Sequence, residues 1–261
     1  MPNIRQNTIL LKNREGQLGV GLGLVFPCAE SIGLVGLLGG FDFINLDGEH
    51  GLFSPESIDA MVRTADGFGL TVTARVPNIE GPTINLFLDR GVMGILGPHI
   101  ETAQQARQLV DACRFVPNGQ RSWGGGQGTF YNDGRLLDQP GLKRTEWMAA
   151  TNEQIIVSAQ LETALAFENL DDILAVDGID AFAWGSNDLA QSMGLPGQPD
   201  HPDVKTAERS VEARIHADGR KMLWDMHTAI NLPSLILDGA DLFAKANADN
   251  DAPNPQMLTS H

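Results

Sequence analysis

Short apolar segments alternate with longer helix-favouring segments along almost the whole chain, and this alternation constrains the fold more than any other feature. Most apolar segments lack the strict apolar–polar alternation of a half-exposed strand, as expected for a parallel sheet that is buried on both faces. Repeated strand–helix units of this size predict a single-domain α/β protein with the (β/α)8 TIM-barrel fold. The eight expected strands span residues 20–26, 41–47, 70–76, 92–98, 155–162, 179–185, 221–226 and 241–247.

The C-terminal end of the expected barrel is atypical. The last residues, ADNDAPNPQMLTSH, contain two prolines and almost no apolar periodicity, so they predict no clear closing helix. The chain has 261 residues, of which 42% are hydrophobic, and is long enough for one large core. We therefore expect a barrel domain over residues 1–246 and a polar tail over residues 247–261.

Two local patterns add detail to this expectation. Ser54 followed by Pro55 predicts a helix start, with the serine as the N-cap and the proline at the first helical position. The long stretch between the fourth and fifth expected strands contains RSWGGGQGTFYND at 121–133, which we interpret as a lid or specificity loop. The glycines of GVGLG (19–23) lie inside an expected strand rather than in a strand-to-helix turn, which argues against a dinucleotide-binding loop.

The composition excludes several classes of function. The formal net charge is −15 and is spread along the chain, so we expect no binding to nucleic acid or to an anionic membrane. No apolar run approaches the length of a membrane span, and the first residues lack the apolar run of a signal peptide, which favours a cytoplasmic protein. Cys28 and Cys113 lie far apart and form no C-x-x-C motif, so neither a zinc site nor a redox site is indicated.

Polar side chains gather at the carboxyl ends of the expected strands. In a barrel of parallel strands these ends converge on one rim, whatever their separation in sequence. The strand starts hold no comparable set. The rim residues are Asp47, Glu49 and His50 after the second strand, Arg75 at the end of the third, Gln160 and Glu162 at the end of the fifth, and Asp188 after the sixth.

The residue types at this rim indicate a particular chemistry. Glu162 and Asp188 are hard oxygen donors on neighbouring strands, and such a pair suits Mg²⁺, Mn²⁺ or Co²⁺. His50 has acidic neighbours and is a natural proton acceptor near neutral pH. Arg75 supplies a fixed positive charge where an anion would develop during a reaction.

Each of these residues also has a purely structural interpretation. Glu162 could cap the helix that begins at Thr163, and Asp188 could be a turn residue. Arg75 could pair with surface acids, and His50 taken alone is more often structural. Because all four chemical groups fall on the same rim, one shared site explains them better than four coincidences. The other histidines show no paired-ligand spacing and are interpreted as structural: His99, His201, His216, His227 and His261.

Six motifs along the chain resemble those of one family. LDGEH, TARVP, NLFLDRG, LGPHI, QLET and GSNDLA occur in the order seen in the metal-dependent class II pyruvate aldolases. That group is typified by 4-hydroxy-2-oxoheptanedioate aldolase and is related to the citrate lyase beta subunit. The resemblance runs from about Gly19 to Asp241, which is nearly the whole chain. Each motif alone is weak, but six in order at compatible spacing are specific.

The resemblance implies how a substrate would be held. Glu162 and Asp188 would bind the divalent metal (Mg²⁺, Mn²⁺ or Co²⁺), which binds the carboxylate and keto oxygens of pyruvate or a 2-oxo acid. Gln160 would contact that substrate. The backbone at Ser186, Asn187 and Asp188 would hold the substrate carboxylate.

The resemblance also implies the catalytic roles and the assembly. Arg75 would stabilise the enolate oxygen, and His50 would be the base. Asp89, from a neighbouring subunit, would raise the basicity of His50, while Asp47 and Glu49 would support the site. The expected partners are a small 2-oxo acid and an aldehyde, and the expected assembly is a homo-oligomer, a trimer of dimers by family resemblance.

Several functions are compatible with these residues. The favoured one is reversible, metal-dependent aldol cleavage of a 4-hydroxy-2-oxo acid to pyruvate and an aldehyde. The same metal–enolate chemistry would serve an oxaloacetate decarboxylase or an acyl-CoA lyase, although the chain shows no basic cluster for the CoA phosphates. A barrel that binds a small acid without turnover is a third possibility. No lysine ends an expected strand apart from Lys245 in the last one, which disfavours a Schiff-base aldolase.

Overall fold

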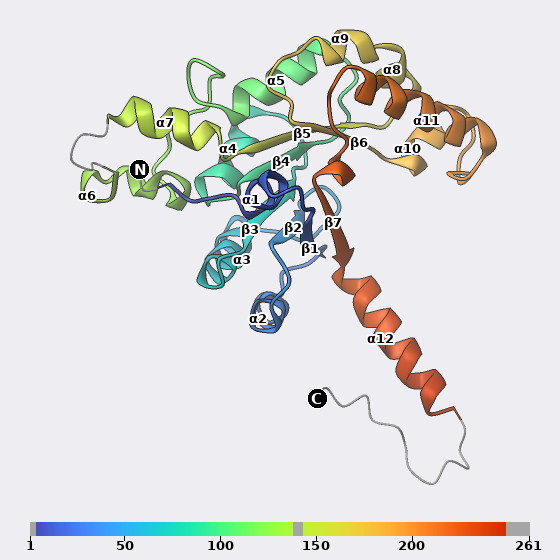
Figure 1. Cartoon of the computed structure of the whole chain (residues 1–261), viewed down its shortest axis with the longest axis horizontal. Helices are drawn as coiled ribbons and strands as arrows, with labels where there is room; N and C mark the ends of the chain where they lie inside the picture. Colours follow the sequence, from blue (N-terminus) through green and yellow to red (C-terminus); the bar gives the residue numbers. More distant parts are fainter. Residues whose placement is uncertain (1–3, 138–142, 249–261) are drawn as a thin grey trace.

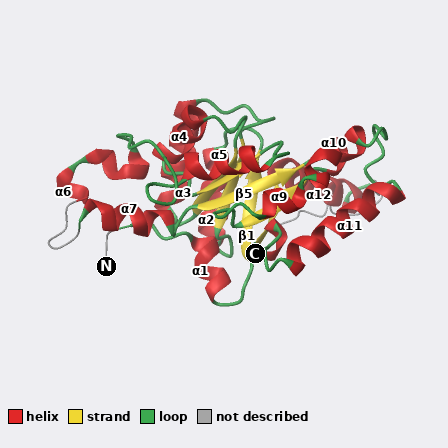
Figure 2. Cartoon of the chain, turned by 90° about the horizontal axis from the view of Figure 1, so that it is seen from above, coloured by secondary structure: helices red, strands yellow, loops and turns green. Residues whose placement is uncertain are grey.

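The computed structural model describes residues 4–137 and 143–248, so the expected polar tail beyond residue 248 lies outside the described residues. Within these residues, seven parallel strands form one curled sheet, a TIM-barrel-like half-barrel with helices around it (Figures 1 and 2). The strand order is β6-β5-β4-β3-β2-β1-β7. The strands are β1 (Gly19–Leu24), β2 (Phe43–Asp47), β3 (Thr71–Arg75), β4 (Gly94–Gly97), β5 (Ile156–Leu161), β6 (Ala181–Trp184) and β7 (His227–Asn231).

Helices follow most of the strands, as the sequence pattern predicts. None of the described helices is long and apolar enough to cross a membrane. The α-helices are α1 (Thr8–Arg14), α2 (Ala29–Leu38), α3 (Pro55–Gly67), α4 (Gly81–Asp89), α5 (Ala103–Cys113), α6 (Gly134–Leu137), α7 (Arg144–Asn152), α8 (Ala164–Glu168), α9 (Leu170–Leu174), α10 (Ser186–Ser192), α11 (Pro202–Ala217) and α12 (Leu232–Ala246). The 3-10 helices in the described part of the chain are η1 (Gln127–Asn132) and η2 (Leu223–Asp225).

Local sequence signals and strand register place the rim residues. The Ser54 side chain accepts the Ser57 backbone N–H at the start of α3, with Pro55 in the first turn, as predicted. All six residues of β5 are buried, which fits a strand covered on both faces. In the register of β2 with β3, Asp47 lies opposite Arg75, so the last residues of two adjacent strands meet.

The C-terminal part differs from the prediction. The predicted eighth strand at 241–247 is wrong, because those residues continue helix α12. Large apolar residues stand at positions 235 and 236 and again seven positions later, at 242 and 243, which is a helical spacing. The short run at 241–247 taken alone does not reveal this spacing. The predicted seventh strand at 221–226 is also displaced. That segment contains η2 and a single bridge to β6, and the strand that pairs with β1 begins at residue 227.

Helix α12 therefore does not cover the open edge of the half-barrel. It extends away from the body of the molecule (Figure 1), and Leu232 is the one α12 residue that is buried among those described. Strands β6 and β7 form the two edges of the described sheet. In the part of the chain that the structure describes, the bridge from Phe182 to Met222 is the only pairing beyond the β6 edge.

The glycine-rich segment at 121–133 packs against the end of α4. A Cβ at Gly126 would lie 2.0 Å from the Asp89 carbonyl oxygen, so only glycine allows the approach there. A Cβ at Gly124 would lie 2.0 Å from Asp89 Oδ2 and would displace that carboxylate. Because α4 runs back from the strand ends, this contact lies at the opposite end of the sheet from the rim. In its own subunit the segment is therefore not a lid over the rim.

A partly buried histidine at the start of β7 should make folding stability depend on pH. Burial lowers the pKa of His227 from 6.5 to about 4, and the ring packs edge-on against Phe43 at a centroid distance of 4.6 Å. Between these pH values the unfolded chain binds a proton that the folded chain does not. The free energy of unfolding should therefore fall as the pH drops from about 6.5 to about 4, by at most about 3 kcal/mol for this residue.

Urea unfolding of the parent and of His227→Gln over this pH range measures the effect. Other groups titrate equally in both proteins, so the difference between them isolates His227. If the free energy of unfolding depended on pH equally in the two proteins, the lowered pKa of His227 would be contradicted.

Candidate active site

An arginine–carboxylate network fixes one side of the rim. Arg75 Nε and Nη2 donate to the two carboxylate oxygens of Asp47 at 2.9 and 2.5 Å, and Nη1 lies 3.0 Å from Glu49 Oε2. Asp47 also accepts the backbone N–H groups of Glu49 and His50, both at 3.2 Å. Burial alone would raise the pKa of Asp47, but the Arg75 hydrogen bond and the His50 N–H hold it below its usual range. The guanidinium is thereby fixed in one orientation.

Glu162 is a nearly inaccessible carboxylate on the same rim, with 1% of its surface exposed. Its Oε2 accepts Gln160 Nε2–H at 2.7 Å, and its Oε1 accepts the backbone N–H of His99 at 3.1 Å. Thr163, not Glu162, supplies the side-chain cap of helix α8, so the capping interpretation of Glu162 is wrong. A Cβ at Gly185 would lie 2.4 Å from Glu162 Oε2, so a larger residue here would displace that carboxylate.

Asp188 lies in the first turn of α10, directly after β6, and is exposed. Burial raises the pKa of Glu162, and the negative charges of Glu49 and Asp188 add to this effect, while His99 opposes it. Glu162 and Asp188 are therefore close enough to repel each other. Ser186 and Asn187 precede Asp188 at the start of the same helix.

Two histidines lie at this rim, and the sequence interpretation identified only one of them. His50 is mostly exposed, with Nε2 3.9 Å from Glu49 Oε2. His99, interpreted from sequence as structural, lies between two carboxylates, with Nε2 3.1 Å from Glu49 Oε1 and Nδ1 3.4 Å from Glu162 Oε1. Its backbone has a φ of 53°, which is uncommon outside glycine. The available signal was its place directly after the fourth strand, in LGPHI.

Asp89 does not belong to the rim of its own subunit. It ends helix α4, at the opposite end of the sheet, where Arg121 Nη2 lies 3.4 Å from its Oδ1. Burial raises the pKa of Asp89, and Arg121 opposes that effect. Any action of Asp89 on His50 therefore requires a second subunit.

An open cavity of about 460 Å³ adjoins the rim. Asp47, Arg75 and Gln160 line one part of it, and Gln160 Oε1 is buried there without a hydrogen-bond partner among the described residues. Trp184 and Trp224 line another part and form an edge-to-face pair at 4.6 Å. The sequence interpretation did not identify these tryptophans. The cavity thus combines a fixed cation, an available amide oxygen and an aromatic wall.

The carboxylates of this rim fit a divalent cation. Glu162 and Asp188 repel each other and offer hard oxygen ligands, and a cation between them would relieve that repulsion. Among the described residues no three His, Cys, Asp or Glu side chains form a ligand cluster. An ion held here would thus need further ligands from substrate or solvent, as catalytic Mg²⁺ commonly does.

Comparisons with known proteins identify the family of this chain. The family model described as HpcH/HpaI aldolase/citrate lyase matches residues 35–252. The chain is 33% identical over 207 residues to 4-hydroxy-2-oxovalerate aldolase from Rhodococcus jostii (strain RHA1), covering 79% of this chain and 76% of the relative. It is 32% identical over 210 residues to hydroxypyruvate/pyruvate aldolase from Cupriavidus necator, covering 80% and 74%.

A solved structure shares the fold over nearly the whole chain. The HpcH/HpaI aldolase from Desulfitobacterium hafniense DCB-2 superposes with a TM-score of 0.78 at 25% sequence identity, covering 94% of this chain and 98% of that one. The family that the six motifs predicted is confirmed. The chain belongs to the HpcH/HpaI aldolase/citrate lyase family and is a carbon–carbon lyase of the aldolase type.

Proposed function

We propose that this enzyme catalyses reversible, divalent-metal-dependent aldol cleavage of a 4-hydroxy-2-oxo acid to pyruvate and an aldehyde. The observation that carries the proposal is the fixed guanidinium of Arg75 beside a pair of repelling carboxylates, Glu162 and Asp188. An enolate needs positive charge that is already in place when it forms, and this rim offers it.

The metal would be Mg²⁺, Mn²⁺ or Co²⁺, held by Glu162 and Asp188. When bound, it would supply Lewis-acid polarisation of the 2-oxo acid. Gln160, whose Oε1 is free of partners among the described residues, would orient the substrate. The backbone at Ser186 and Asn187 would hold the substrate carboxylate, as the family resemblance implies.

Side chains of the protein would then accept one proton and stabilise one developing negative charge. His50 takes the proton of the 4-hydroxyl group while the C3–C4 bond breaks and the aldehyde forms. The bonding electrons pass into the enolate of pyruvate, and Arg75 lies beside its oxygen. Protonation of the enolate carbon completes pyruvate. Asp47 and Glu49 keep Arg75 in position throughout.

We further propose a homo-oligomer, with a trimer of dimers as the specific form. Helix α12 exposes several large apolar side chains, and monomeric proteins seldom leave such a surface uncovered. Asp89 also lies at the far end of its own sheet, where it could reach only the His50 of another subunit. The exposed apolar residues of α12 are Leu235, Ile236, Leu237, Leu242 and Phe243.

Charged residues on α12 should therefore weaken assembly. Leu242 is 58% exposed, so Leu242→Lys costs the isolated subunit little but buries a charge in any interface that covers it. We expect Leu242→Lys to lower the molar mass measured by sedimentation equilibrium. Ala244→Lys is the matched control, because it adds the same charge at an exposed position that helical geometry turns away from the face shared by Leu235 and Leu242. Equal masses for the parent and Leu242→Lys would contradict the role of this helix.

A direct test of the function offers pyruvate with a panel of aldehydes, with and without Mg²⁺ or Mn²⁺. We expect 4-hydroxy-2-oxo acid products only when metal is present. Release of CO2 from oxaloacetate without aldol products would favour a decarboxylase, and cleavage of an acyl-CoA would favour a thioester lyase. Binding of pyruvate without any turnover would favour the non-catalytic alternative.

A further inference from the structure

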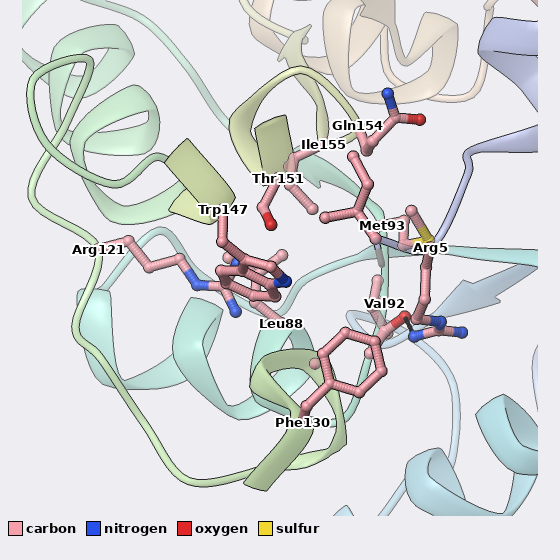
Figure 3. A pocket seen from close by; sticks show the side chains of 13 residues that line it. Arg5, Leu88, Val92, Met93, Arg121, Phe130, Trp147, Thr151, Gln154 and Ile155 are labelled. Atoms are coloured by element: carbon pink, nitrogen blue, oxygen red, sulfur yellow. Dashed lines mark hydrogen bonds between the residues drawn. The ribbon is translucent and has the colours of Figure 1, made fainter. Parts of the chain in front are cut away.

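A second cavity lies at the end of the sheet opposite the candidate active site. Figure 3 shows the side chains that line it. Met93 and Ile155 line it and directly precede β4 and β5, which places it at the amino ends of these strands. Its volume is about 30 Å³. A space of this size holds one or two water molecules or a ligand of a few heavy atoms.

Three polar groups in this cavity are buried without partners. Arg121 Nε, Trp147 Nε1 and Thr151 Oγ1 have no hydrogen-bond partner among the described residues. The three residues are 6%, 2% and 8% exposed, and Figure 3 shows all three side chains around the pocket. Buried N–H and O–H groups are nearly always paired in native proteins, because leaving one unpaired costs free energy. All three residues line this one cavity, so a single ligand placed there would lie beside three unpaired polar groups.

The charge around the cavity favours an anion. Among the described lining residues there are two arginines, Arg5 and Arg121, and no aspartate or glutamate. Arg5 forms an ion pair with Asp66, so Arg121 is the cation left for a ligand. The acid beside Arg121 is Asp89 at 3.4 Å, which is long for an ion-paired hydrogen bond, and on its other side the guanidinium lies over the Phe115 ring. A buried cation that is paired so loosely attracts a small negative group.

The lining also has an apolar part. Leu88, Val92 and Ile155 line the same cavity as the polar groups. A carboxylate has about four acceptor sites and can take all three donors. A water molecule can accept the two N–H groups and donate to the Thr151 hydroxyl group, but it brings no negative charge to Arg121. A methyl group attached to such a carboxylate would lie against the apolar side chains.

We propose that this cavity is a binding site for a small carboxylate of the size of formate or acetate. Its oxygens accept hydrogen bonds from Arg121 Nε–H, Trp147 Nε1–H and the Thr151 hydroxyl group. The site is separate from the proposed substrate site and does not depend on the reaction assigned there.

The indole N–H signals of the full chain provide the test. Trp147 reports on this cavity, and Trp184 and Trp224 report on the cavity at the rim, so one spectrum distinguishes the two places where a carboxylate could bind. The probes are sodium formate and sodium acetate, titrated into ¹⁵N-tryptophan-labelled protein in a buffer without other small anions. Trp147→Phe assigns the signal. We expect a saturable downfield shift of the Trp147 signal with both probes.

Thr151→Val tests the geometry, because it removes the hydroxyl group and keeps the shape. We expect about a fivefold weaker affinity for acetate, as for the loss of one hydrogen bond. Thr206→Val, at an exposed position of α11, is the control and should leave the affinity unchanged. Unmoved signals of the other tryptophans in the Thr151 variant show that it is folded.

Three results would overturn the proposal. The first is a Trp147 signal that neither probe moves, which would leave water as the occupant. The second is an acetate affinity that Thr151→Val does not change. The third is valerate binding as well as acetate, which a cavity of this size should not allow.

Discussion

Replacing Glu162 by glutamine is expected to abolish metal-dependent cleavage, with kcat/KM at least about 10³-fold lower than in the parent. The substitution preserves the shape of the side chain but removes one of the two carboxylates that would hold the cation. The measurement is the rate of pyruvate release from a 4-hydroxy-2-oxo acid at saturating Mn²⁺, together with Mn²⁺ affinity by calorimetry. Both should fall.

The matched control is Glu168→Gln, the same change at an exposed position of the following helix. It should leave rate and affinity unchanged. Circular dichroism separates loss of the metal site from loss of the fold, since the introduced amide still offers one acceptor oxygen to its neighbours. Full activity of Glu162→Gln, or of the parent in excess chelator, would refute the metal role.

Replacing Arg75 by alanine is expected to slow pyruvate enolisation by about 10²-fold or more. Arg75 is held by Asp47 and Glu49 rather than by Glu162, so its removal should affect the enolate far more than metal affinity. The measurement is deuterium exchange into the methyl group of pyruvate, with Mn²⁺ affinity measured in parallel. An unchanged exchange rate would contradict the role.

Two further variants sharpen this result. Arg75→Lys keeps the charge but cannot make the two-pronged contact with Asp47, so it should recover little of the rate. Arg63→Ala removes an exposed arginine that pairs with Asp59 on helix α3, and it should leave exchange unchanged. A lysine variant as fast as the parent would indicate that charge alone suffices at this position.

The rim residues could be predicted because their positions at strand ends follow from local sequence patterns. Short apolar strands are visible in the sequence, and parallel strands necessarily end at the same edge of their sheet. Asp47, Arg75, Glu162 and Asp188 each occupy such an end, and the structure brings their charges close enough to interact. Their roles in catalysis stay predictions until the variants above are measured.

The C-terminal region could not be predicted in the same way. The run at 241–247 is short and only partly apolar, and such a run suits a strand or a helix equally well. The choice depends on the segment directly after β7, where Pro233 opens a helix that runs through those residues. The spacing of apolar residues distinguishes a helix from a strand only when the full length of α12 is considered.

The sequence by itself determined the family, the parallel α/β class and the residue types at the strand ends, because these depend on local order along the chain. Only the tertiary structure decided that His99 lies between Glu49 and Glu162, which requires a backbone turn with positive φ. It also decided that Asp89 and Arg121 meet at the far end of the sheet. Contacts between side chains distant in sequence depend on how helices return along the sheet. Local sequence patterns do not predict that arrangement.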